Sequence, residues 1–204
     1  MEITELQPER DVLIVRSWLS AHVRDHLRAW SKAVGTPWDD EQIAVHMDAH
    51  GLVDREWRDL DHAAQHAPRG CVRAARVGGR AVGVLWAEER VDRFLCRPVA
   101  ALCWVYVARA WRGRGAAQAL MGAYDAWAAT RPVAAREVYV TAGNAAAQRL
   151  YEAHGLTVSD HRMFAPGPGA ATAAVDGPAR ATSAAAAAPA RSAADDLLPP
   201  TERM

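Results

Sequence analysis

Residues 105–120, VYVARAWRGRGAAQAL, decide the fold of this chain. They begin inside an apolar run of ten residues, 99–108, which is typical of a buried β-strand. Gly113 and Gly115 follow, and an alanine-rich sequence with helical spacing comes next. Glycines between a strand and a helix leave backbone N–H groups uncovered at the positive end of the helix dipole. This junction is therefore either a plain structural turn or an anion-binding loop.

The charge around this loop is positive, although the whole chain is neutral. Residues 97–114 contain four arginines and no acid, which suits a polyphosphorylated ligand, while the chain has 24 Lys+Arg and 24 Asp+Glu. That balance argues against a protein that coats nucleic acid with a basic face. No apolar run approaches the roughly 20 residues of a membrane span, and the first residues lack a signal-peptide pattern. We expect a cytoplasmic protein that binds neither nucleic acid nor a membrane.

Hydrophobic periodicity outward from the loop predicts the order β, α, α, β, β, β, α, β, α, β. These elements fall in residues 1–7, 11–30, 39–67, 71–77, 80–89, 101–108, 111–130, 136–142, 144–154 and 156–164. The second helical region is interrupted near Gly51, and Gly78-Gly79 forms a hairpin turn. An antiparallel meander then feeds a strand-helix-strand crossover with parallel strands. The predicted class is α/β, with a central mixed sheet flanked by helices.

The folded domain is expected to end near Phe164. Residues 165–204 contain 15 Ala, 6 Pro and 3 Gly and no aromatic residue. Such a segment cannot bury enough apolar surface to offset its ordering entropy. The sequence therefore predicts one domain over residues 1–164 and an Ala/Pro-rich disordered tail over 165–204.

A second motif, NAAAQRLYEAHGL, occupies residues 144–156. Asn144 stands where a helix begins, so it is either the helix N-cap or a ligand contact. Tyr151 shares one helical face with Ala147 and Leu150, which by itself makes it a core aromatic residue.

Together the two motifs resemble those of the GNAT superfamily of N-acetyltransferases, which use acetyl-CoA. Arg112-x-x-Gly115-x-Ala117 matches the Q/R-x-x-G-x-G/A loop of that family, and residues 144–156 resemble its NxxAxxLYxxxGF segment. The element order is similar over residues 1–164. Three features depart from the family pattern: Arg109 stands where proline is common, Leu156 replaces Phe, and one strand rather than two follows the last helix.

The resemblance implies a GNAT (acyl-CoA N-acyltransferase) fold and a role for each matching residue. The backbone that would hydrogen-bond the acetyl and pantetheine groups belongs to Val105, Tyr106 and Val107. The loop that would cradle the pyrophosphate consists of Arg112, Gly113, Arg114, Gly115, Ala116 and Ala117. Asn144 would contact the pantetheine arm, and Tyr151 would reach the thioester sulfur. The cofactor would lie where two strands of the sheet separate.

Acid–base chemistry then assigns two further tasks. An alkyl amine has a pKa near ~10.4, so a base must remove a proton before the amine attacks a thioester. The leaving thiolate needs a proton, which the Tyr151 hydroxyl can donate. Some family members carry a glutamate on the strand equivalent to 101–108, but this strand has no acid. Glu88 and Glu89, on the preceding strand, are the candidate bases, and water is the alternative.

The acceptor is predicted from charge alone. Residues 36–66 carry eight acids against two arginines, which is either a solvated helix face or the border of a site for a cationic amine. His46 and His50 are spaced i, i+4, but no third ligand is marked, so no metal is predicted.

The predicted function is transfer of an acetyl group from acetyl-CoA directly to an acceptor amine, either a small cationic molecule or a peptide. The alternative is a non-catalytic acyl-CoA-binding or protein-interaction module on the same fold. The sequence leaves the oligomeric state open, a homodimer included.

Overall fold

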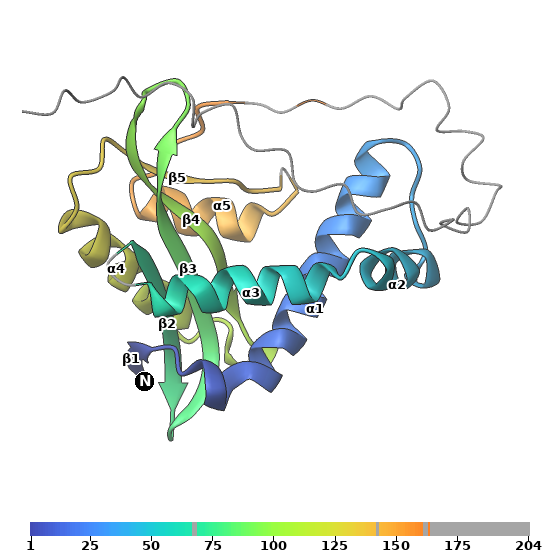
Figure 1. The fold of residues 1–204 in the computed structure, drawn as a ribbon, viewed down its shortest axis with the longest axis horizontal. Helices are drawn as coiled ribbons and strands as arrows, with labels where there is room; N and C mark the ends of the chain where they lie inside the picture. The colour runs from blue at the N-terminus through green and yellow to red at the C-terminus, as the bar shows by residue number, and fades with distance from the viewer. Residues whose placement is uncertain (67–68, 142, 161–162, 164–204) are drawn as a thin grey trace, which may run out of the picture. The chain divides into compact units, whose positions relative to one another are not determined.

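The computed structural model describes residues 1–66, 69–141, 143–160 and 163. Within these residues, five strands form one sheet in the order β1-β2-β3-β4-β5 (Figure 1). The strands are β1 Glu2–Glu5, β2 Gly70–Val77, β3 Arg80–Asp92, β4 Arg97–Val107 and β5 Arg136–Val138. Strands β1 to β4 are antiparallel neighbours, and β5 is parallel to β4. The predicted mixed sheet is confirmed.

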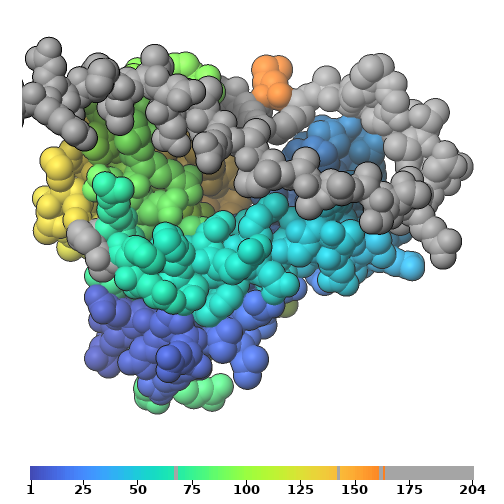
Figure 2. Space-filling view, viewed as in Figure 1, coloured from blue at the N-terminus to red at the C-terminus, as the bar shows by residue number. Residues whose placement is uncertain are grey.

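Helices cover both faces of this sheet. They are α1 Pro8–Ala33, α2 Asp40–Ala49, α3 Leu52–Gln65, α4 Ala116–Ala129 and α5 Ala145–Ala153. Apolar residues of α1 and α3 pack on one face of β2, β3 and β4, and those of α4 and α5 pack on the other. Helix α2 packs mainly on α1 and α3 in a small cluster of its own. Figure 2 shows α3 lying across the middle of the first face.

Local sequence sets the boundaries of these elements. Pro8 occupies the first turn of α1, where its missing N–H is not needed. Asp39 and Gln42 form a capping box at the start of α2, as the sequence predicts for Asp39. Gly51 takes a left-handed conformation, with φ of 55°, and separates α2 from α3.

A buried ion pair anchors α1 to the sheet. Asp11 and Arg76 side chains are each 4% exposed, and the Arg76 Nη1 lies 3.1 Å from an Asp11 oxygen. The Arg76 Nε also donates to the Thr4 hydroxyl at 2.9 Å. Because removal of one partner would leave an uncompensated buried charge, this network holds β1, α1 and β2 in one arrangement.

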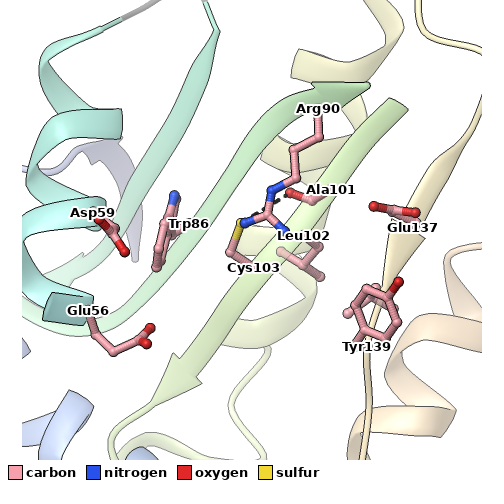
Figure 3. A pocket seen from close by; sticks show the side chains of 10 residues that line it. Glu56, Asp59, Trp86, Arg90, Ala101, Leu102, Cys103, Glu137 and Tyr139 are labelled. Atoms are coloured by element: carbon pink, nitrogen blue, oxygen red, sulfur yellow. Dashed lines mark hydrogen bonds between the residues drawn. The ribbon is translucent and has the colours of Figure 1, made fainter. Parts of the chain in front are cut away.

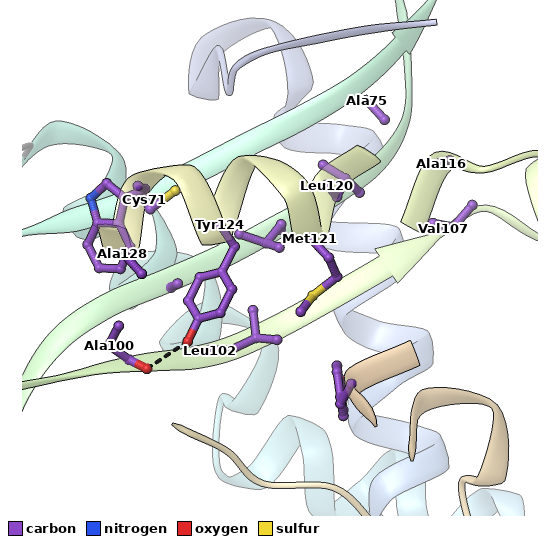
Figure 4. Packing of buried hydrophobic residues seen from close by; sticks show 14 of the residues in the cluster. Cys71, Ala75, Ala100, Leu102, Val107, Ala116, Leu120, Met121, Tyr124 and Ala128 are labelled. Atoms are coloured by element: carbon purple, nitrogen blue, oxygen red, sulfur yellow. Dashed lines mark hydrogen bonds between the residues drawn. The ribbon is translucent and has the colours of Figure 1, made fainter. Parts of the chain in front are cut away.

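On the opposite face of the sheet, a buried hydrogen bond of Tyr124 anchors α4. It is fully buried, and its hydroxyl donates to the Ala100 carbonyl at 2.7 Å (Figure 4). Leu120 and Met121 pack beside it in the same core. The helix that follows the glycine loop is thereby fixed against β4.

The end of the domain differs from the sequence prediction in two places. The strand expected over 136–142 is shorter, since β5 ends at Val138. The strand expected over 156–164 is wrong for residues 156–160, which belong to no strand of the described sheet and are exposed from Thr157 onward. An alternating pattern forms a strand only where a sheet edge accepts its hydrogen bonds. Residues 161–162 and 164, and the tail predicted over 165–204, lie outside the described residues.

Two glycines test how tightly the layers pack. A Cβ added at Gly70 would lie 2.0 Å from the Ala63 carbonyl oxygen, so Gly70→Ala must push α3 away from β2. We expect this change to lower the free energy of unfolding by about 1–3 kcal/mol. In α4, a Cβ at Gly122 meets no atom within 4 Å. Gly122→Ala is therefore expected to raise the free energy of unfolding by about 0.5–1 kcal/mol. Urea unfolding of both variants checks the opposite signs, and equal shifts would contradict the packing argument.

Candidate active site

The parallel strands β4 and β5 separate after three paired positions. The last pair is Leu102 with Val138, whereas β4 continues to Val107. Among the described residues, β4 therefore has no strand neighbour on its β5 side from Cys103 onward. The register between β3 and β4 also skips Cys103, because Trp86 pairs with Trp104 and Ala87 with Leu102. A β-bulge thus lies where the two strands part.

The three β4 residues predicted to bind the cofactor lie on this open edge. Val105 and Val107 pack with the α4–α5 core, and Tyr106 stacks on Trp18 with 5.4 Å between ring centroids. Packing therefore fixes the strand from both faces and leaves its edge available for hydrogen bonds to a ligand.

The glycine loop forms an open cradle at the start of α4. Gly113 and Gly115 have φ of 72° and 80°, which residues with a Cβ rarely adopt, and a Cβ at either would meet no atom within 4 Å. No side chain of the described residues caps α4. Its first N–H groups at Ala116 and Ala117 consequently point out of the helix without a side-chain acceptor.

Two arginines add positive charge to this cradle. The Arg112 Nε donates to the Val107 carbonyl at 3.0 Å, which ties the loop to the end of β4. The Arg114 guanidinium lies 5.1 Å from the centre of the Trp111 ring. Uncovered N–H groups, a helix dipole and fixed cations together fit a pyrophosphate. These residues therefore suit the nucleotide end of coenzyme A.

Asn144 and Tyr151 lie at the two ends of α5. The Asn144 Oδ1 accepts from the Ala147 N–H at 3.1 Å, so this side chain is the N-cap of α5. Tyr151 is 9% exposed and belongs to the α4–α5 core. Burial raises the pKa of the Tyr151 hydroxyl to about 12, so the phenol stays protonated at ordinary pH.

The two glutamates predicted as bases have different surroundings. Glu88 is on the α3 face of β3, like Trp86, and accepts from the Arg90 Nε at 2.6 Å. Glu89 follows it along the strand and, by the alternation of side chains, faces the opposite side of the sheet. The structure does not bring these two carboxylates together.

A cavity of about 230 Å³ lies on the α3 face, beside the point where β4 and β5 part (Figure 3). Three acids line it, Glu56 and Asp59 from α3 and Glu137 from β5, together with Arg90 and Cys103. Because Arg90 is already paired with Glu88, the cavity presents an excess of negative charge. Sequence reasoning missed Glu137, because no local pattern shows that β5 places it beside α3.

Three other acids of residues 36–66 cap a helix or form ion pairs between helices. Asp39 caps α2, Asp40 pairs with Arg28, and Asp54 pairs with Arg16. Trp38 packs against Trp30 and His46 and does not line the cavity. The acidic character of the site therefore comes from a few residues of α3 and β5, and not from the whole segment.

Cysteine and histidine chemistry has little support at this site. Burial raises the pKa of the Cys103 thiol to about 12, so it is not a thiolate at neutral pH. The rings of His46 on α2 and of His50, the C-cap of that helix, lie 4.4 Å apart, and neither residue lines the cavity. In the described part of the chain, no group of three or more His, Cys, Asp or Glu could hold a metal ion.

No described helix is long and apolar enough to cross a bilayer.

A mixed sheet whose parallel strands part beside a glycine-rich helix start is the architecture that the two sequence motifs led us to expect. The model of the acetyltransferase (GNAT) family matches residues 24–156, and the chain belongs to this family. No curated protein matches the sequence significantly.

Solved structures share the fold at low sequence identity. A mutant protein from Bacillus halodurans is 16% identical, with a TM-score of 0.61, and covers 81% of this chain and 99% of its own. The YycN protein of Bacillus subtilis is 22% identical, with a TM-score of 0.56, over 79% and 95% of the two chains. An aminoglycoside antibiotic 6'-N-acetyltransferase from Acinetobacter haemolyticus is 14% identical, with a TM-score of 0.50, over 80% and 96%.

Proposed function

We propose that this protein transfers an acetyl group from acetyl-CoA directly to the amine of a small cationic acceptor. One observation carries the proposal: Cys103 both begins the open edge of β4 and lines the acidic cavity. An acyl donor bound along that edge would therefore meet an amine bound in the cavity.

The donor would be held from two sides. The cradle of Gly113, Gly115 and the first turn of α4 would bind the pyrophosphate, and the edge of β4 from Val105 to Val107 would bind the pantetheine arm. Bound acetyl-CoA would supply an acetyl thioester, which is activated toward amines. Asn144 would reach the arm with the amide NH₂, because its oxygen is used in the helix cap.

Tyr151 would act as the general acid. When the C–S bond breaks, the thiolate needs a proton, and the Tyr151 hydroxyl is a donor that burial keeps protonated. The buried ring also fixes the direction of the hydroxyl, which supports a role in orientation.

The acetyl group would move directly from donor to acceptor. A covalent acetyl-enzyme needs an activated nucleophile, and Cys103 is the cysteine beside the proposed reaction site. Its raised pKa leaves almost no thiolate, so attack by the acceptor amine itself is favoured. We therefore expect kinetics in which acetyl-CoA and the amine bind together in a ternary complex, and not ping-pong kinetics.

The cavity favours a small and positively charged acceptor. Its volume of about 230 Å³ is below the roughly 300–1,000 Å³ of pockets for drug-sized ligands. Its acids would attract an ammonium group and hold it near the thioester. The proposed acceptor class is therefore a short aliphatic amine with a net positive charge.

Thiol release with a panel of amines tests this proposal. We expect acetyl-CoA-dependent turnover with small cationic amines, and lower kcat/KM with neutral or anionic amines of equal size. Because surface attraction is screened by salt, kcat/KM for the cationic amine is also expected to fall several-fold between low salt and about 0.5 M.

Tight CoA binding without thiol release from any amine would identify the protein as a non-catalytic binding module. A neutral acceptor that proves best would refute the charge argument while leaving acetyl transfer intact.

A further inference from the structure

We propose that Glu56 of α3 is the general base that takes the proton from the acceptor amine. This inference rests on the proposed acetyl transfer and adds a residue to it. Glu56 lies on the helix that covers one face of the sheet, and Tyr151 lies on a helix of the other face. The base and the acid would therefore act on the substrate from opposite faces of the sheet.

The position of Glu56 carries the argument. Its side chain extends from α3 into the cavity, across from Cys103 at the β4 bulge (Figure 3). The same cavity is walled by Trp86, which is 5% exposed and whose indole N–H has no partner in the described structure. A ligand seated between these groups would have its reacting nitrogen beside the open edge of β4.

The other carboxylates are less suited to the task. Glu88 is engaged by Arg90, and Glu89 faces the opposite side of the sheet. Asp59 is exposed, whereas Glu56 is half-buried. Glu137 stands opposite Ala101, where β4 and β5 are still hydrogen-bonded and no edge is open. Glu56 is thus the carboxylate that combines burial with a place next to the reaction site.

The electrostatic surroundings make Glu56 a stronger base than an exposed glutamate. Burial raises the pKa of its carboxyl, and neighbouring Asp59 raises it further. Arg55 on the same helix, His26 on α1 and Arg90 on β3 act in the opposite direction. The net shift is upward, so the Glu56 carboxylate takes up a proton more readily than an exposed glutamate does.

The proton balance closes with the chain's own groups. The bound ammonium gives one proton to Glu56, and the neutral nitrogen attacks the thioester carbon. The C–N bond forms, the C–S bond breaks, and the sulfur receives the proton of Tyr151. The nitrogen loses its second proton to the Tyr151 oxygen, and Glu56 releases its proton to water. The products are an acetamide and free coenzyme A.

The pH dependence of Glu56→Gln tests this role, with the best cationic amine from the panel. In the parent protein, kcat/KM should rise with pH through the Glu56 pKa and then level off, because a deprotonated base is required. In the variant, only the small neutral fraction of free amine reacts. Its kcat/KM should fall at least tenfold at pH 7 and rise about tenfold per pH unit toward the amine pKa.

Two further variants separate a base from a structural role. Glu56→Asp keeps a carboxylate and should retain the level region at a reduced rate. Asp61→Asn changes a partly buried acid of α3 that bonds Gln65, outside the cavity, and should keep the parent profile. A level region retained in Glu56→Gln, or lost instead in Glu88→Gln, would overturn the inference. Absence of turnover in the parent protein with every amine would instead overturn the proposed function.

Discussion

Replacement of Gly115 by glutamate should weaken the binding of coenzyme A by about 10³-fold. The change places a carboxylate where the pyrophosphate would lie, at the positive end of α4, and forces a side chain onto a backbone with φ of 80°. Loss of two charge-assisted hydrogen bonds at about 1.5–3 kcal/mol each is sufficient for this effect, since 1.4 kcal/mol is a factor of ten.

Isothermal titration calorimetry with coenzyme A measures this loss. Gly122→Glu is the matched control, because it adds the same charge to an exposed and open position of the same helix, remote from its N-terminus. The control should bind nearly as the parent does. Equal affinity of the Gly115 variant and the parent would mean that the loop is only a structural turn.

Replacement of Tyr151 by phenylalanine should lower kcat by ~10²-fold or more with little change in the KM for acetyl-CoA. The ring and its packing remain, so the loss belongs to the hydroxyl. Because burial raises the pKa of this hydroxyl to about 12, the parent rate should show no decline from loss of its proton below about pH 11.

Tyr124→Phe is the control for this experiment. Tyr124 lies in the same core, but its hydroxyl is bound to the Ala100 carbonyl. Its loss removes one buried hydrogen bond, while the Ala100 carbonyl stays in the β4–β5 ladder, so stability should fall by about 0.5–1.5 kcal/mol and kcat should stay near the parent value. If the two variants behave alike in kcat and stability, Tyr151 is a core residue without a role in proton transfer.

Much of the fold follows from local sequence. The order of elements, the break at Gly51 and the turn at Gly78-Gly79 were predictable, because side-chain periodicity and positive φ are properties of short segments. The strand-to-helix junction at Gly113 and Gly115 was predictable for the same reason.

Local pattern fails where a partner is required. Residues 156–160 alternate like a strand, but none of the described strands pairs with them. The Asp11–Arg76 pair joins residues that are 65 positions apart, and neither stands out in the sequence. The structure shows that the Asn144 oxygen caps α5, whereas the contact of its amide with a ligand stays a prediction.

The sequence by itself determined that a glycine-rich helix start follows a buried strand, and that a second motif with a tyrosine comes after it. The tertiary structure alone decided which acids face the site. Of the eight acids in residues 36–66, only Glu56 and Asp59 line the cavity, and Glu137 joins them from a strand 78 positions beyond Asp59. The physical reason is that periodicity reports which face of an element is buried, whereas the packing of α3 on β2 and β3 and the parting of β4 from β5 depend on contacts between distant segments.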